Sequence, residues 1–277
     1  MSLLLLFFFP ILIVIFAIAS LKYLIDYLKQ KKILDTPKKR SNHLNPMPKG
    51  GGFIIIPIII VSIFIYIYFE FLDLQPWFSI CCLTTVLFLT SSYDDLYNLS
   101  SSLRLGIQAI CVTVAVYFLN AEIFEFAEKV HTNFSLFSNL DNLVILLKIF
   151  LILFWLWIVN LFNFMDGMDG LTSSQVCTFS MGIIFLSVFA DHSLELGYLG
   201  IILFAPLLGF FYWNKPPAKV FLGDAGSIPL GFLIGSIIIY SLVTFHSILP
   251  LVILILYHFC DSTITLLIRI FKKKKYI

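Results

Sequence analysis

The chain has 277 residues, of which 60% are hydrophobic and 12% are charged, and its net charge is +2. An average soluble domain is about 45–50% apolar and about 25% charged. So few charged groups cannot cover a water-facing surface, which excludes a soluble enzyme, a disordered chain and a secreted disulfide-rich scaffold. The small net charge argues against nucleic acid as a partner. The five cysteines lie in apolar stretches without CxxC spacing, so we interpret them as packing residues.

Apolar segments long enough to cross a membrane follow one another along the chain. A hydrocarbon core of about 30 Å needs about 20 helical residues. The pattern predicts an all-α polytopic membrane helix bundle with about nine transmembrane helices, forming a single domain over residues 1–277. The nine segments are 2–22, 51–72, 76–92, 104–120, 143–162, 171–190, 196–213, 228–247 and 249–268.

The basic residues give this bundle an orientation. All Lys and Arg residues except Lys129 and Lys148 lie in the segment 22–50, in the connections 93–104 and 213–227, or in the C-terminal tail. Lys and Arg are enriched in cytoplasmic loops of membrane proteins. We therefore expect the N-terminus outside and the C-terminus in the cytoplasm of a bacterial inner membrane.

Acidic residues also collect on the predicted cytoplasmic side. Ionisable groups next to membrane helices are costly and are functional candidates by default. Four separate connections, each with a carboxylate, therefore predict one shared site. The residues are Asp35, Asp94, Asp95, Asp166, Asp169 and Asp224.

The first connection, residues 35–52, contains three prolines and ends in three consecutive glycines. Proline stiffens a loop, and glycine lets backbone N–H groups approach a ligand closely. Arg40, His43 and Lys49 are candidate phosphate-binding residues. The alternative is a basic stretch that holds anionic lipid head groups.

The second connection begins with the adjacent carboxylates Asp94 and Asp95. Neighbouring carboxylates repel each other, and a metal, a cationic partner or a shared proton would relieve the repulsion. The alternative is that they solvate or cap a helix end.

The third connection has Asn163, Asp166 and Asp169 at intervals of three residues. On a helix this spacing places neighbours on one face. Oxygen ligands without Cys or His indicate a hard cation, Mg²⁺ or Mn²⁺. The alternative is an Asp-Gly turn between two helices.

The fourth connection contains Asn214, Lys219 and the sequence Gly-Asp-Ala-Gly-Ser at 223–227, directly before an apolar segment. A helix N-terminus of this kind can offer N–H groups to an anion. The alternative is that Asp224 only caps the helix. Structural and functional interpretations of His258 and Asp261, in the last apolar segment, both stay open.

Together these connections resemble the polyprenyl-phosphate N-acetylhexosamine-1-phosphate transferase family, the MraY/WecA-like enzymes of glycosyltransferase family 4. The specific signal is Asn-Phe-Met-Asp-Gly-Met-Asp-Gly at 163–170, followed by Pro-Ala-Lys-Val-Phe-Leu-Gly-Asp-Ala-Gly-Ser at 217–227. The similarity covers roughly residues 30–270. The Ser-Asn-His and Lys-Gly-Gly-Gly of the first connection look most like the branch that initiates O-antigen or other surface polysaccharides.

The resemblance implies transfer of HexNAc-1-phosphate from a UDP-HexNAc to undecaprenyl phosphate, with release of UMP and with Mg²⁺ or Mn²⁺ as cofactor. It implies membrane lipids as surroundings and is compatible with a homodimer. Attack by the lipid phosphate and an aspartyl-phosphate intermediate both stay open. The implied catalytic residues are Asp94, Asp95, Asp166 and Asp169; the implied substrate-binding residues are Arg40, His43, Lys49, Asn214 and Lys219; the implied metal ligands are Asn163 and Asp224.

One feature of the family has no counterpart in these 277 residues. Family members usually carry a cytoplasmic loop rich in His and Arg after the helix that matches 249–268, whereas here the sequence after that segment is Lys-rich. The alternative function is therefore a relative that binds substrate without turnover. A transporter is disfavoured, because the acids collect at one interface and no repeat is evident.

Reporter fusions test the predicted orientation. We expect fusions at positions 45 and 135 to report opposite membrane faces, because the Lys and Arg bias places 22–50 in the cytoplasm and the connection after 120 outside. The measurement uses two reporters, one that is active only in the cytoplasm and one that is active only outside it. Two fusions on the same face would contradict the topology.

Overall fold

A computed structural model describes residues 2–31, 34–35, 46–134, 139–189, 193–246 and 248–271. This part of the chain is almost entirely helical, and its two short strands, β1 (Leu34–Asp35) and β2 (Met47–Pro48), pair antiparallel. The helices are α1 (Ser2–Gln30), α2 (Gly52–Tyr68), α3 (Leu74–Tyr97), α4 (Ser101–Phe118), α5 (Asn120–Phe134), α6 (Leu140–Met165), α7 (Leu171–Phe189), α8 (Leu194–Asn214), α9 (Asp224–Phe245), α10 (Leu249–Leu254) and α11 (Leu256–Phe271).

The all-α membrane bundle predicted from the sequence is confirmed. Within the described residues, seven helices are long and apolar enough to cross a membrane: α1, α3, α4, α6, α7, α8 and α9. Helix α2 is equally apolar but has 17 residues, at the lower limit of about 17 for a spanning helix. The number of nine spans stays a prediction.

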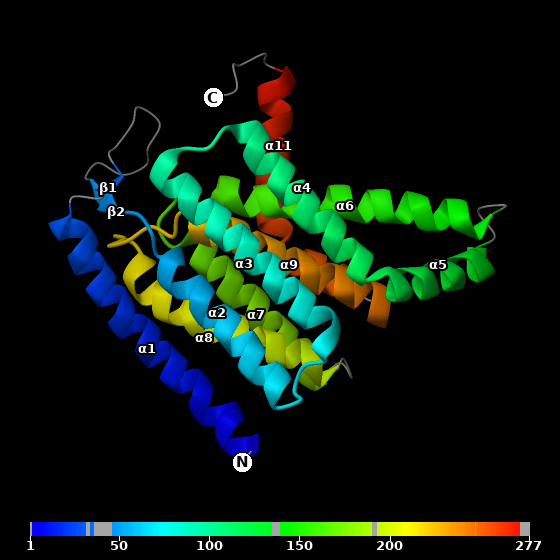
Figure 1. Cartoon of the computed structure of the whole chain (residues 1–277), viewed down its shortest axis with the longest axis horizontal. Helices are drawn as coiled ribbons and strands as arrows, with labels where there is room; N and C mark the ends of the chain where they lie inside the picture. The colour runs from blue at the N-terminus through cyan, green and yellow to red at the C-terminus, as the bar shows by residue number, and fades with distance from the viewer. Residues whose placement is uncertain are drawn as a thin grey trace.

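Two differences from the expected segments stand out. The expected segment 249–268 breaks at Ile255; α11 then packs against α6, and its C-terminal end extends beyond the bundle (Figure 1). The sequence from 251 to 259 holds no Pro or Gly that would signal the break. Helix α5 was not expected, because Glu122, Glu125, Glu128 and Lys129 lower the hydropathy of a segment that buries little beyond Ile123 and Ala127.

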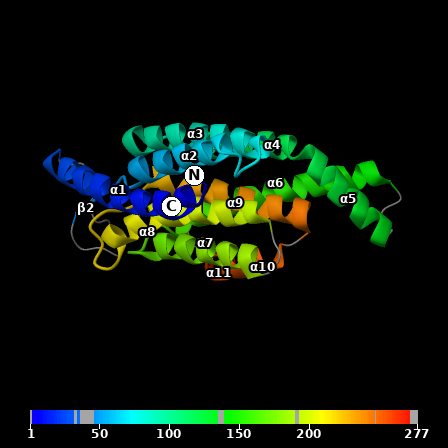
Figure 2. The same ribbon diagram turned by 90° about the horizontal axis from the view of Figure 1, so that it is seen from below.

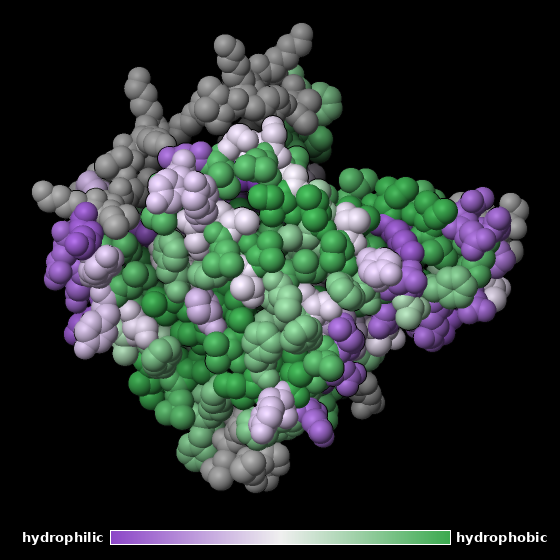
Figure 3. All heavy atoms as spheres, in the orientation of Figure 1, coloured by the Kyte–Doolittle hydropathy of each residue, from purple (hydrophilic) through white to green (hydrophobic). Residues whose placement is uncertain are grey.

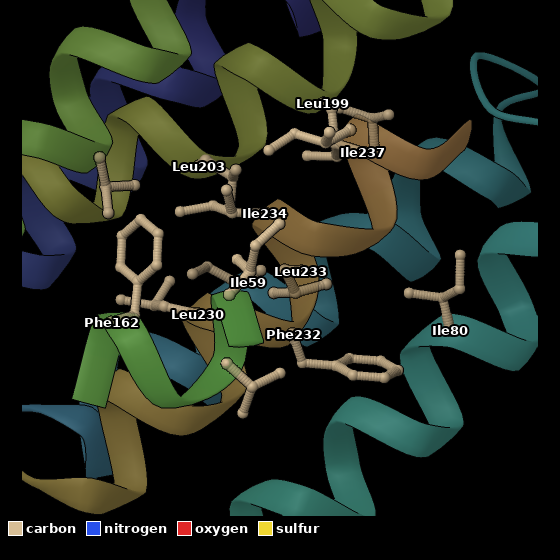
Figure 4. Packing of buried hydrophobic residues seen from close by; sticks show 14 of the residues in the cluster. Ile59, Ile80, Phe162, Leu199, Leu203, Leu230, Phe232, Leu233, Ile234 and Ile237 are labelled. Carbon is tan, nitrogen blue, oxygen red and sulfur yellow. The ribbon is translucent and has the colours of Figure 1, made fainter. Parts of the chain in front are cut away.

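Helix α9 is the centre of the molecule. Of its most apolar 18-residue window, 83% is buried, against 22% for α1 at the periphery. It packs against α6, α3 and α2, and Figure 2 shows it between the layer of α3 and the layer of α7. Figure 4 shows its apolar side chains pointing in several directions, toward Ile59 of α2, Ile80 of α3, Phe162 of α6 and Leu203 of α8. A helix that is apolar all round lies in a protein core or spans a membrane, and α9 lies mainly against other helices.

Glycines on α9 let its neighbours come close. A Cβ on Gly231 would meet the Cα of Val159 at 2.9 Å, so α6 crosses α9 at backbone distance. One turn further along, Trp155 of α6 stacks on Phe232 and donates from Nε1 to the Phe232 carbonyl at 2.9 Å. This contact satisfies the polar atom of a fully buried indole.

A polar cluster joins α3, α8 and α9 at the ends of these helices that lie far from the four acidic connections. Glu195, in the first turn of α8, accepts hydrogen bonds from Trp77 Nε1 at 2.7 Å, from the Tyr240 hydroxyl at 2.7 Å and from the Asp73 amide at 3.2 Å. Three elements thus share one carboxylate. The cluster fixes the orientation of α9 at the end opposite Asp224.

The outer surface of the bundle is apolar. Figure 3 shows a broad hydrophobic area over the middle of the molecule, with hydrophilic residues gathered at the end of α1 and on the α5–α6 hairpin. Side chains such as Phe16 (60% exposed) and Leu153 (62% exposed) face outward. An apolar groove of about 760 Å³ also opens between α1 and α2. Exposed apolar area on this scale fits contact with lipid.

Substitution of Gly231 tests the packing of α9. We expect Gly231→Ala to lower the free energy of unfolding by about 1–3 kcal/mol, because the added methyl meets backbone that cannot move aside. The measurement is thermal unfolding in detergent. Gly106→Ala in α4 is the matched control, since nothing lies within 4 Å of a Cβ there; it should leave stability unchanged or slightly raised. Equal losses in both variants would contradict the packing.

Candidate active site

The connection before α2 and the connection before α9 are bonded to each other through backbone groups. The amides of Gly50 and Gly51 both donate to the Phe221 carbonyl, at 3.0 and 2.9 Å, and the amide of Gly52 donates to the Leu222 carbonyl at 2.8 Å. Two segments about 170 residues apart in sequence therefore lie side by side. The glycines of the first connection serve this contact.

Glycine is required where α2 meets α9. A Cβ on Gly52 would collide with the backbone nitrogen of Gly226, and a Cβ on Gly51 would collide with the ring of Phe210. Any larger residue at position 52 would push the start of α2 away from the start of α9. This approach places Lys49 next to Asp224.

Two cations and three carboxylates meet at this point. Lys49 Nζ lies 2.7 Å from Asp95 Oδ1 and 3.0 Å from Asp224 Oδ1. Arg104 Nη1 lies 2.9 Å from Asp94 Oδ2 and 3.2 Å from Asp224 Oδ2. Asp224 is thus held from both sides. These residues, with Asn98 and Leu99, line a cavity of about 120 Å³.

The charge state of Lys49 is set by two opposing effects. Partial burial lowers its pKa, but the carboxylates of Asp224 and Asp95 together raise it, and the net result is a pKa well above the usual value. The ammonium group therefore stays protonated at neutral pH. It provides a permanent positive charge beside the cavity.

The three carboxylates differ in exposure and in their other partners. The side chains of Asp94 and Asp95 are each 6% exposed, whereas that of Asp224 is 22% exposed. Asp94 Oδ1 accepts from the Leu99 amide at 2.6 Å, which secures the turn after α3. Asp95 accepts from the Ala225 amide at 2.9 Å, at the start of α9. Asp224 is the most accessible of the three.

The third connection brings Asp166 and Asn163 near the same point. Asp166 follows the last residue of α6, and burial, together with the nearby carboxylate of Asp224, raises its pKa to about 7. Asn163 Nδ2 donates to Ser227 Oγ at 3.0 Å, in the first turn of α9. This bond leaves the amide oxygen of Asn163 as a candidate ligand.

Three predicted site residues instead fasten the connection that carries Asp224. Asp169 Oδ2 accepts from the Ala218 amide at 2.9 Å. Asn214 is buried, accepts from Ser173 Oγ at 2.8 Å and donates to the Val220 carbonyl at 3.0 Å. Lys219 Nζ lies 5.0 Å from the ring centroid of Trp213.

Two further predicted residues, Arg40 and His43, lie outside the described residues. Of the predicted set, the structure therefore brings Lys49, Asp95 and Asp224 into direct contact. Asp94 joins them through Arg104, and Asn163 and Asp166 lie beside them.

The amino-acid sequence of this chain matches a known family. A profile described as Glycosyl transferase family 4 matches residues 77–242. The chain belongs to this family. The matched range includes Asp94, Arg104 and Asp224, and it begins after Lys49. The resemblance inferred from the motifs is confirmed at the level of the family.

Curated relatives carry two kinds of name. The undecaprenyl-phosphate alpha-N-acetylglucosaminyl 1-phosphate transferase of Thermotoga maritima is 31% identical over 74% of this chain and 56% of its own length. A probable undecaprenyl-phosphate N-acetylglucosaminyl 1-phosphate transferase of Bacillus subtilis is 28% identical over 87% and 65%. A phospho-N-acetylmuramoyl-pentapeptide-transferase of Streptococcus uberis is 39% identical over 47% and 39%. The chain thus spans 39% to 65% of the length of these three relatives.

Arg104 belongs to the cluster around Asp224, although no sequence motif assigns it to the site. Its guanidinium joins Asp94 to Asp224. The sequence does contain a signal for the position of Arg104, which is the helix cap at Ser100. Ser100 caps α4, with its Oγ accepting from the Leu103 amide at 3.4 Å, and the short turn that begins at Asn98 brings the chain straight back toward α3. The first turn of α4 therefore lies beside the last turn of α3.

A double-mutant cycle tests the ion pair between Asp94 and Arg104. We expect Asp94→Asn and Arg104→Gln to show a coupling of about 1 kcal/mol in thermal unfolding, because the carboxylate is buried although the guanidinium is one-third exposed. The control cycle uses Glu125 and Lys129, an exposed pair on α5 at 2.8 Å. That cycle should show no measurable coupling. Strictly additive effects at Asp94 and Arg104 would contradict the pairing.

Proposed function

We propose that this protein transfers HexNAc-1-phosphate from a UDP-HexNAc to undecaprenyl phosphate and releases UMP. The observation that carries the proposal is the position of Asp224, accessible and held between Lys49 and Arg104 at one end of an apolar bundle. The family supports it independently. The names of the Thermotoga and Bacillus relatives point to the same reaction class.

The physical problem in this reaction is to bring two anions together. Lys49 and Arg104 provide two fixed positive charges toward which the phosphates can move. An apolar outer surface keeps the lipid acceptor next to the bundle, so that its phosphate reaches the same interface. Positioning and charge neutralisation are the main contributions an enzyme makes to phosphoryl transfer.

We infer direct displacement at phosphorus. An oxygen of the lipid phosphate forms a bond to the β-phosphorus of the UDP-sugar. The bond from that phosphorus to the bridging oxygen breaks, and UMP leaves with the oxygen. An aspartyl-phosphate would require Asp94 or Asp95 as nucleophile, but the side chains of both are only 6% exposed. Direct attack does not require either carboxylate to reach the phosphorus.

We also propose a divalent cation, Mg²⁺ or Mn²⁺, at Asp224 and the amide oxygen of Asn163. In the part of the chain that the structure describes, no three His, Cys, Asp or Glu side chains are grouped to hold a metal. Mg²⁺ fits nevertheless, because it is usually held by one or two carboxylates with the remaining positions filled by water and substrate phosphate. When bound, it would neutralise charge that develops on the phosphates.

The site would face the cytoplasm of a bacterial inner membrane, where nucleotide sugars are available. We further propose that the product starts a surface polysaccharide such as O-antigen, on the similarity of the first connection to that branch. The pentapeptide-transferase names among the relatives make the cell-wall donor the competing substrate.

UMP release tests the function. The chain in detergent is given undecaprenyl phosphate, Mg²⁺ and, in turn, UDP-GlcNAc, UDP-GalNAc and UDP-MurNAc-pentapeptide. We expect release that requires the lipid and stops reversibly in EDTA, and we expect Asp224→Asn to reduce it by at least roughly 100-fold, as loss of a group that stabilises the transition state does. Asp141→Asn, an exposed acid at the opposite end of α6, is the control and should retain activity.

Three outcomes separate the alternatives. Release with the pentapeptide donor alone would overturn the surface-polysaccharide proposal. Release of UMP that persists in EDTA would overturn the proposal of a divalent cation. Binding of UDP-sugar without release, from protein that stays monodisperse, would favour a relative that binds substrate without turnover.

A further inference from the structure

Helix α9 begins without a cap of its own. The first N–H groups of an α-helix have no partner inside the helix, and a side chain at the N-cap position usually accepts from one of them. In α9 this position is Gly223, which has no side chain and a φ of +82°. The amides of Asp224 and Ala225 therefore need an acceptor from elsewhere in the molecule.

Asp95 of α3 provides that acceptor. Its Oδ2 accepts from the Ala225 amide at 2.9 Å, and its Oδ1 lies 3.4 Å from the Asp224 amide. A Cβ at position 223 would lie 2.9 Å from Asp95 Oδ2, so glycine leaves the room that this carboxylate uses. A negative charge here is also favoured by the dipole of α9.

The two adjacent aspartates thus have different partners. Asp94 bonds to the turn after its own helix and to Arg104. Asp95 bonds to the backbone of a helix that lies 129 residues further along the chain, and to Lys49. A phosphate that competes for Lys49 would still leave Asp95 held by the Ala225 amide.

We propose that Asp95 is a positioning residue: it caps α9 from α3 and so fixes the place of Asp224. The inference rests on the proposed function, because it is the role given to Asp224 that makes its position matter. Asp95 acts on the reaction through α9. Its Oδ2 accepts from the Ala225 amide and its Oδ1 pairs with Lys49 at 2.7 Å, and proton transfer or attack on phosphorus is left to other groups.

Two substitutions separate position from charge. Asp95→Asn removes the charge and the ion pair with Lys49, and it keeps one acceptor oxygen for the Ala225 amide. Asn caps helices about as well as Asp. Asp95→Glu keeps the charge and displaces both oxygens by a methylene group. If Asp95 is a positioning residue, Asp95→Asn should retain turnover within about tenfold of the unchanged protein. The same role predicts a loss of roughly 100-fold for Asp95→Glu, the usual effect of a 1 Å misplacement. A general base or nucleophile predicts the reverse order.

Hydrogen exchange gives a readout that does not depend on activity. In Asp95→Glu and in Asp95→Ala, the amides of residues 224–227 should exchange roughly fivefold faster or more, the effect of losing a cap worth about 1 kcal/mol. They should stay protected in Asp95→Asn. Asp94→Asn is the matched control, because Asp94 bonds to Leu99 and Arg104 instead, and exchange at 224–227 should not change.

Each result decides the proposal. Asp95→Asn less active than Asp95→Glu, or unchanged exchange in Asp95→Ala, would overturn it. If Asp95→Ala does not fold, the pair Asp95→Asn and Asp95→Glu carries the test. If the unchanged protein releases no UMP with any donor, the proposed function fails, and exchange at 224–227 alone decides whether Asp95 caps α9.

Discussion

The close approach of α2 and α9 at Gly52 and Gly226 governs the arrangement of the site. Because no Cβ separates the two backbones, the amide of Gly52 reaches the Leu222 carbonyl, and the connection before α2 lies along the connection before α9. Lys49 then lies beside Asp224 without needing a long flexible loop. A side chain at either glycine would separate the cation from its carboxylates.

Charge distribution explains how this arrangement can accept a ligand. Asp224 shares Lys49 with Asp95 and shares Arg104 with Asp94, so each cation joins it to a different aspartate of α3. Three carboxylates then face two cations. An incoming phosphate that takes the place of a carboxylate at either cation leaves that carboxylate unpaired and adds to the negative charge of the cluster, which is unfavourable unless a further positive charge enters with the phosphate. The surplus negative charge is what a divalent cation would offset.

The sequence predicted the all-α membrane bundle, and it predicted that charged residues from separate connections gather at one end of it. Charged residues between apolar segments pointed to Lys49, Asp94, Asp95 and Asp224, because charge next to a membrane has few structural reasons to exist. It did not find Arg104, whose place depends on the tight turn after α3. It also could not show that Asn214 and Asp169 fasten a loop, since that depends on tertiary contacts. Helix α5 was not predicted, because an amphipathic helix with several charged residues lacks the continuous apolar signal of a spanning helix.

The central position of α9 has a consequence for biosynthesis. The helices that surround it, α2, α3 and α6, are all synthesised earlier, and their surfaces toward α9 must wait for a partner that is synthesised after all three. Until residue 224 emerges, Lys49 and Arg104 lack the carboxylate that joins them. Insertion of α9 is thus the step that completes both the hydrophobic core and the ionic cluster. A nascent chain arrested before residue 224 would hold these charged groups at the membrane interface without their common partner.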